Sequence, residues 1–311
     1  MTTAKTKRQM TVRMMKRHWQ MYLLLLLPLL YLLIFKYYPM LGTQIAFKKF
    51  RASQGIWGSE WIGFANFAKF FKSYQFSRVM VNTIAVSFYQ LIAGFPFPII
   101  FALLLNTLSG KWFKKTVQTV TYLPYFISVV VLVGMMFQIF NPTRGIYGTL
   151  YTMATGTTAP DLFGKSEMFR HMYVWSGVWQ NMGFNSVIYI AALSSVSNDL
   201  HEAAMIDGIG RFKRMLYIDL PAIIPTMTVL LILNAGRIMS IGFEKVYLMQ
   251  NDLNLRTSEI ISTYVYKVGL AAGGGDFAYA TAIGLFNSAV NLILIVTVNK
   301  ICNRLGETSL W

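Results

Sequence analysis

The sequence predicts an all-α, polytopic membrane protein with six transmembrane helices. Hydrophobic residues make up 55% of its 311 residues and charged residues only 13%, a more apolar composition than soluble domains have. The net charge of +16 is spread over short basic segments at the ends of long apolar runs. This distribution is typical of membrane orientation, and it argues against a nucleic-acid partner, which would need the charge on one face.

The apolar runs set the positions of the spans. Residues 1–19 are basic and contain no acid, and we interpret them as a cytoplasmic N-terminal segment. A signal peptide is the weaker alternative, because no small-residue cleavage site follows the first apolar run. Residues 20–311 are expected to form one transmembrane domain. The spans are predicted at residues 19–35, 79–106, 117–140, 173–196, 221–242 and 277–299.

The basic residues orient these spans. The segments that six spans would place in the cytoplasm are about twice as rich in Lys and Arg, per residue, as the outside loops, so both chain ends are expected in the cytoplasm. The outside loops fall at residues 36–78, 141–170 and 242–277. In the last loop a helix is expected to start at residues 257–259, and Asp276 is expected to cap the sixth span.

Prolines fall inside two of the predicted spans. Pro96 and Pro98 should kink or break the second span, and Pro124 lies in the first half of the third. Such breaks are tolerated in a membrane where neighbouring groups satisfy the freed carbonyls.

A few polar residues within the apolar runs are candidates for a substrate path. Polar groups are costly in lipid, so they should face the inside of the bundle or a water-filled path. The candidates are Asn181 and Asn185 on the fourth span, and Asn234 and Arg237 on the fifth. Hydrogen bonding between helices is the competing interpretation for each Asn. For Arg237 the alternatives are a uronate carboxylate of a substrate, snorkelling to the outer surface, or a salt bridge.

The sequence lacks the residue sets that catalysis or nucleotide binding would need. No Gly-x-x-x-x-Gly-Lys-Ser/Thr, Gly-x-Ser-x-Gly or His-Glu-x-x-His run occurs, and Cys302 is the single cysteine. The protein is therefore not expected to be an enzyme, to bind a metal or to hold a cofactor. An ion-coupled secondary transporter of a small polar solute is the alternative function, but the predicted spans contain no acidic or His relay residue.

A polar, basic island at residues 197–221 separates the fourth and fifth spans. Residues 200–205 can form a short helix, and the dipeptide Asp207-Gly208 is a turn signal that ends it. Pro221 suits the first turn of the next helix. We expect the short helix to lie across the mouth of the bundle.

This island resembles the EAA loop of ABC-importer permeases. Glu-Ala-Ala, Asp-Gly and Ile-x-Leu-Pro stand at the family's spacing, although Ile209 and Met215 replace the usual small and aromatic residues. The resemblance implies that the short helix docks into a groove of a cytoplasmic ATPase. The residues that would couple the two proteins are Glu202, Ala203, Ala204, Asp207 and Gly208.

Beyond the island, the whole chain resembles sugar-importer permeases of the maltose-transporter type, especially those for plant-polysaccharide oligosaccharides. The likeness lies in Leu-Pro-Leu-Leu with Tyr-Tyr-Pro near the first span, residues 242–248, residues 279–286 and the terminal Ser-Leu-Trp. It implies the type I ABC-importer permease fold in a bacterial cytoplasmic membrane. It also implies a heterodimer with a second, similar permease, two ATP-binding subunits, and an extracytoplasmic binding protein that delivers an oligosaccharide, which could contain uronates.

Overall fold

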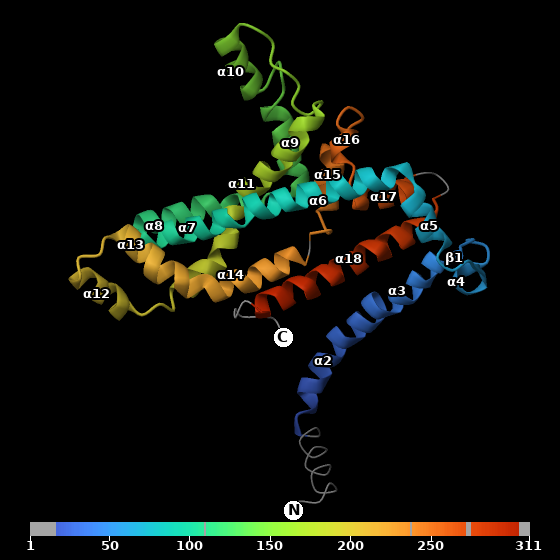
Figure 1. Ribbon diagram of the computed structural model, residues 1–311, viewed down its shortest axis with the longest axis horizontal. Helices are drawn as coiled ribbons and strands as arrows, with labels where there is room; N and C mark the ends of the chain where they lie inside the picture. Colours follow the sequence, from blue (N-terminus) through green and yellow to red (C-terminus); the bar gives the residue numbers. More distant parts are fainter. Residues whose placement is uncertain (1–16, 109, 237, 272–274, 305–311) are drawn as a thin grey trace, which may run out of the picture.

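The chain folds into a bundle of long helices with short helices at its two ends (Figure 1). The structure is a computed structural model, and it describes residues 17–108, 110–236, 238–271 and 275–304. Within these residues, four helices are long and apolar enough to cross a membrane, and a bent helix pair adds a fifth if it is counted as one span. The predicted membrane class is confirmed, and the count is consistent with six spans. The four helices are Trp19–Phe47, Tyr74–Thr107, Arg211–Ala235 and Phe277–Arg304.

The first long helix extends well beyond its predicted end at Phe35. It consists of α2 (Trp19–Leu32), a π-helical turn (Leu33–Tyr37), α3 (Tyr38–Met40) and a 3-10 turn (Leu41–Phe47). The π turn lies directly before Pro39, which has no N–H to offer a carbonyl of a regular α-helix. Residues 36–47 are therefore helical and not part of a loop. All residues of α2 are exposed, and Figure 1 shows α2 standing away from the bundle.

The second long helix runs nearly without interruption despite its prolines. It consists of α6 (Tyr74–Gly94) and α7 (Pro96–Thr107), which follow one line in Figure 1. The N–H of Phe95, between them, still donates to the carbonyl of Leu91 over 3.0 Å. Pro96 lies in the first turn of α7, where a missing N–H costs no intrahelical bond. The expected break is therefore confined to Phe95.

The third predicted span is not one helix. Its two halves, α8 and α9, meet at an angle of 99°. Pro124 lies in the 3-10 turn that ends the first half, and Ser128 caps the second half by accepting a hydrogen bond from the N–H of Val131 over 3.3 Å. The first half also begins earlier than predicted. The elements are α8 (Lys111–Tyr122), the 3-10 turn (Leu123–Phe126) and α9 (Val129–Ile139).

The loops predicted to lie outside contain more regular structure than expected. Loop 141–170 holds a helix, and the first loop holds a two-stranded antiparallel sheet and two helices. The helix expected from residues 257–259 begins slightly later, at Ile261. The elements are β1 (Lys48–Lys49), α4 (Gly55–Gly58), β2 (Glu60–Trp61), α5 (Ala65–Lys72), α10 (Ile146–Thr155), α15 (Phe243–Met249), α16 (Leu255–Ser258), α17 (Ile261–Tyr266) and a π turn (Lys267–Ala271).

The sixth predicted span is α18 (Phe277–Arg304). Asp276 caps it as predicted, because its Oδ1 accepts a hydrogen bond from the N–H of Tyr279 over 3.0 Å. The helix packs along the 3-10 turn of the first long helix and along α5, α14 and α17. The C-terminal end of the first long helix is thereby held against the bundle, although α2 is not.

The helix of the fifth predicted span, the fifth long helix in chain order, begins earlier than the predicted start at Pro221. It consists of α13 (Arg211–Arg214), a π turn (Met215–Asp219) and α14 (Leu220–Ala235). As in the first long helix, the π turn lies directly before the proline and accommodates its missing N–H. The predicted span, 221–242, contains no acid, but the longer helix observed here adds one at its start. Asp219 lies within this membrane-length helix and is buried.

The fourth predicted span, α11 (Ser166–Leu193), lies at the centre of the bundle, packed against α6, α7, α8 and α14. It is long enough to cross a bilayer but is not among the four apolar helices. Gly183 permits a close approach to α8, because an added Cβ would lie 2.1 Å from the carbonyl oxygen of Thr121. Since protein surrounds much of α11, it can hold polar side chains that lipid would not tolerate.

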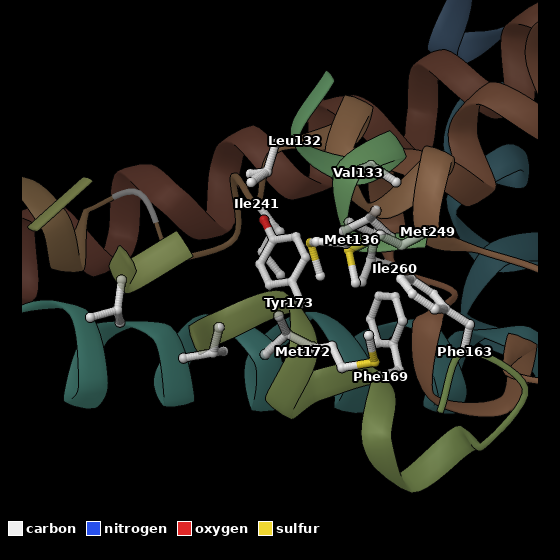
Figure 2. Close-up of a cluster of buried hydrophobic side chains, with 14 of the residues drawn as sticks. Leu132, Val133, Met136, Phe163, Phe169, Met172, Tyr173, Ile241, Met249 and Ile260 are labelled. Carbon is white, nitrogen blue, oxygen red and sulfur yellow. The ribbon is translucent and has the colours of Figure 1, made fainter. Parts of the chain in front are cut away.

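A buried hydrophobic cluster joins α9, α11 and α15 (Figure 2). Apolar side chains from the three helices interdigitate, and Figure 2 shows the ring of Tyr173 lying against them. This packing holds α15 beside α11. Its members include Leu132, Val133, Met136, Phe169, Met172, Tyr173, Val246 and Met249.

We expect the six-span orientation to place Trp57 outside and Trp112 in the cytoplasm. Both side chains are well exposed, at 74% and 85%. In a Cys302→Ser background, Trp57→Cys should react with a membrane-impermeant maleimide in intact spheroplasts, whereas Trp112→Cys should react only after lysis. Labelling of the Trp112→Cys protein in intact spheroplasts would contradict this orientation.

Candidate functional site

A cavity of about 460 Å³ lies between α6, α7, α11 and α14 and the segment that follows α14. Six polar side chains line it: Ser87, Gln90, Asn181, Asn185, Asn234 and Ser240. The structure thus brings together three of the four residues predicted for a substrate path. Arg237, the fourth, lies outside the described residues, and α14 ends before it at Ala235.

Two amides of the cavity, those of Asn181 and Asn234, have side-chain oxygens that are free to accept a hydrogen bond from a ligand. Asn181 Nδ2 donates to the carbonyl of Gly177 over 2.8 Å, and Asn234 Nδ2 donates to the carbonyl of Leu230 over 2.9 Å. Each bond uses one N–H of its amide and leaves the amide oxygen without a donor among the described residues. Asn185, one turn further along α11, is exposed. Convergent amides of this kind suit a ligand that carries many hydroxyl groups.

Sequence reasoning missed the cavity residues that α6 and the segment after α14 provide. Ser87, Gln90 and Gly94 are spaced three and four residues apart, so they share one face of α6. This spacing could have indicated a polar face on α6. It is easily overlooked, because Gln90 is a single amide within a strongly apolar run. Ser240 has no such signal, because the chain there is not helical.

Other polar residues of the predicted spans tie helices to connecting segments. Gln180 Nε2 donates to the carbonyl of Ile127 over 2.9 Å. Asn291 Nδ2 donates to Ser240 Oγ over 2.9 Å, and its Oδ1 accepts from the N–H of Met239 over 3.0 Å. Each of these bonds ties a helix to a connecting segment, since Ile127 lies just before α9, and Met239 and Ser240 follow α14.

The lining of the cavity is uncharged among the residues that the structure describes. Nor does this part of the chain gather three His, Cys, Asp or Glu side chains where they could hold a metal ion. The lining itself therefore offers a ligand hydrogen bonds and apolar contacts.

At one end of the bundle, the island forms the short helix α12 (Asn198–Ile206) (Figure 1). Ser197 is its N-cap, and Ser197 Oγ accepts a hydrogen bond from the N–H of Asp199 over 3.2 Å. The helix is longer than the predicted residues 200–205, and it lies at the mouth of the bundle as expected.

The Asp-Gly dipeptide ends α12 with a left-handed turn. Gly208 has a φ of +73°, a conformation that costs an L-residue roughly 1–2 kcal/mol. The N–H of Gly208 donates to the carbonyl of Met205, and the N–H of Ile209 to that of Ala204, over 3.1 and 2.9 Å. These two bonds satisfy carbonyls that the end of a helix would otherwise leave free.

The predicted coupling residues lie mostly on the surface. Ala204 is buried against the bundle. The others are exposed: Glu202, Ala203, Asp207 and Gly208. Large apolar side chains surround them, and Ile206 is 87% exposed. This combination of small, charged and exposed apolar residues is suited to docking against another protein.

A buried carboxylate ties α12 to the long helices. Asp219 Oδ1 lies 3.2 Å from His201 Nε2 of α12, and it accepts a hydrogen bond from Asn106 Nδ2 of α7 over 3.3 Å. Arg214 Nη1 also donates to the carbonyl of His201 over 3.4 Å. The position of α12 is therefore linked to both the second and the fifth long helices.

The chain is similar over nearly its whole length to known membrane transport proteins. Residues 94–304 match the model of a family described as binding-protein-dependent transport system inner membrane component. Protein LplB of Bacillus subtilis is 41% identical over 297 residues, which cover 96% of this chain and 92% of the relative. The polygalacturonan/rhamnogalacturonan transport system permease protein YteP of Bacillus subtilis is 40% identical over 291 residues, with coverages of 94% and 90%.

Solved structures show the same fold. A bacterial alginate ABC transporter, in complex with an alginate pentasaccharide-bound periplasmic protein, contains a chain with a TM-score of 0.87 and 36% identity. The match covers 96% of this chain and 99% of the other. This chain therefore belongs to the family of binding-protein-dependent transport system inner membrane components, the permeases of ABC importers.

Proposed function

We propose that this chain is the membrane-spanning permease subunit of an ATP-driven importer that moves an oligosaccharide through the Asn-lined cavity. The observation that carries the proposal is the convergence of Asn181, Asn185 and Asn234 on one cavity, in a chain with the fold of an alginate transporter subunit. Amides donate to and accept from sugar hydroxyls. The relatives named for polygalacturonan, rhamnogalacturonan and alginate support an acidic oligosaccharide as the cargo.

Two exposed apolar surfaces support a multi-subunit assembly. The helix α2 stands away from the bundle, where it is available to pack against a second, homologous permease in a heterodimer (Figure 1). The surface of α12 is available for an ATP-binding subunit, so a pair of permeases would hold two of them. An extracytoplasmic binding protein would deliver the sugar. The assembly would lie in a bacterial cytoplasmic membrane with both ends of this chain in the cytoplasm.

The contacts of α12 suggest how ATP hydrolysis would reach the cavity. Closure of the ATP-binding subunits would push on α12. The bonds of Asp219 with His201 and Asn106 would pass this displacement to α7 and to the fifth long helix. Both helices line the cavity, so their movement would change its access from one side of the membrane to the other.

An ion-coupled secondary transporter of a small polar solute remains the alternative function, and the contact of the buried Asp219 with the partly exposed His201 favours it. The pair, however, does not line the Asn-containing cavity. Uptake by vesicles separates the two functions. ATP-dependent uptake that stops when the ATP-binding subunit is omitted supports the importer, whereas uptake driven by an ion gradient without that subunit would contradict it.

We expect Glu202→Lys and Gly208→Pro each to abolish ATP-driven uptake without impairing membrane insertion. The first reverses a charge on the docking surface, and the second places a residue with a fixed negative φ where the chain needs +73°. Co-purification of the ATP-binding subunit from detergent is the measurement. Lys115→Glu, an exposed charge reversal on α8, is the matched control. Normal co-purification and uptake by both variants would refute the docking role.

We expect Asp219→Ala to lower stability by roughly 1–3 kcal/mol, because His201 and Asn106 lose their common acceptor in a buried site. Uptake per ATP hydrolysed should fall as α12 loosens from the long helices. Thermal unfolding in detergent and the ratio of uptake to hydrolysis measure the two effects. Asp219→Asn keeps an acceptor oxygen and should be milder. Wild-type coupling in Asp219→Ala would show that these contacts do not transmit the movement.

We expect Asn185→Leu to reduce sugar uptake several-fold without changing the stability of the protein. The substitution removes a hydrogen-bonding group of about 1 kcal/mol from the cavity wall and keeps a similar volume. Thr297→Val on α18 is the control, since Thr297 is an exposed polar residue outside the cavity lining. Initial rates of uptake in proteoliposomes are the measurement, and equal rates for Asn185→Leu and the control would remove Asn185 from the site.

A further inference from the structure

Lys245 is a buried cation beside the cavity. It lies on α15 and is only 8% exposed. Its Nζ donates to the carbonyl of Tyr173 over 2.9 Å and lies 4.8 Å from the centre of the Tyr173 ring. Within the described part of the chain, no Asp or Glu oxygen lies within the 4.0 Å of a salt bridge to this ammonium.

Burying the ammonium of Lys245 without a carboxylate partner costs free energy. Burial lowers the pKa of Lys245 to about 8, so the amine still carries its proton at neutral pH. An ammonium has three N–H donors, and a single carbonyl satisfies one of them. Two other cations, Arg78 and Lys267, share the buried carboxylate of Glu259. A buried charge is costly unless it is paired, so a carboxylate that reached Lys245 would supply the missing partner.

A gap above Gly177 connects Lys245 with the cavity. Lys245 Nζ lies 3.4 Å from the position that a Cβ of Gly177 would occupy, and Gln90 Nε2 lies 4.0 Å from the same position. Gly177 and Gln90 both line the cavity. Asn181 lies one turn further along α11, with its amide bonded to the Gly177 carbonyl. The missing side chain at Gly177 therefore leaves room next to two N–H donors, one of them charged.

We propose that Lys245 is a specificity-determining residue, and that its ammonium pairs with a uronate carboxylate of the oligosaccharide in the cavity. One carboxylate oxygen in the gap above Gly177 would accept from Lys245, and the other from the amide of Gln90. The bond from Lys245 to Tyr173 is kept, because the carboxylate uses the remaining N–H groups. This inference rests on the proposed function as a sugar importer, and it locates the charge that an acidic cargo requires.

The test uses the whole transporter in proteoliposomes, with its second permease, ATP-binding subunits and binding protein. The probes are a galacturonate trisaccharide and its carboxyl-reduced, neutral counterpart, both at concentrations that saturate the binding protein. Lys245→Met should reduce uptake of the acidic sugar at least about tenfold, and leave neutral uptake and stimulated ATP hydrolysis unchanged. Lys245→Arg should retain most acidic uptake. Lys72→Met, which removes an exposed outer lysine on α5, should behave as wild type.

The outcomes separate this inference from the proposed function. Lys245→Met should unfold at a temperature no lower than wild type, since it removes a desolvated charge. Acidic uptake by Lys245→Met within twofold of wild type would overturn the inference alone. Equal loss of both sugars would also overturn it and assign Lys245 a structural role. Failure of the wild-type transporter to take up either sugar with ATP would overturn the proposed function and this inference together.

Discussion

The enclosure of α11 by other helices is the constraint on which the rest of the structure depends. A helix with Gln180, Asn181 and Asn185 along its length would leave costly amides in lipid if it stood alone. Packing against α6, α7, α8 and α14 covers much of its surface, and the close contact at Gly183 shows how tightly α8 approaches. The same packing leaves the polar face of α11 on the cavity. The packing of the four helices around α11 therefore both shields its amides and forms the cavity that they line.

A buried carboxylate connects segments at each end of the bundle, whereas weaker, uncharged contacts connect the helices in the middle. At the end opposite α12, Glu259 lies between Arg78 and Lys267 and so joins α6 to the segment after α16. At the end that carries α12, Asp219 joins three segments. Between them the helices share single hydrogen bonds and small residues around an uncharged cavity. Movement in the middle therefore breaks fewer strong interactions than movement at either end.

Irregular turns at three prolines determine whether a long helix continues or changes direction. The π turns before Pro39 and Pro221 let both helices continue through a residue that cannot donate a hydrogen bond. The second π turn also contains Asp219, so it helps to set the buried carboxylate that contacts α12. After the turn that contains Pro124, by contrast, the chain bends by 99° between Phe126 and Val129, and α9 leaves the direction of α8. That change of direction brings α9 against α15 and so helps to position Lys245.

The sequence by itself determined the membrane class, the order of the long helices, the cap at Asp276, and the short helix ended by Asp207-Gly208. These features depend on local composition and on turn residues whose effect reaches only a few positions. It also selected Asn181, Asn185 and Asn234, because polar residues in apolar runs need a special environment. Only the tertiary structure placed them around one cavity.

The tertiary structure alone decided the start of the fifth long helix, the partners of Asp219 and the place of Lys245. A pattern that starts a helix at Pro221 cannot anticipate a π turn that extends the helix back to Arg211. Lys245 reads as an ordinary basic residue of an outside loop, and it becomes a buried charge beside Gly177 only because α9, α11 and α15 pack together. Such contacts join residues far apart in the chain, and no local pattern of side chains records them.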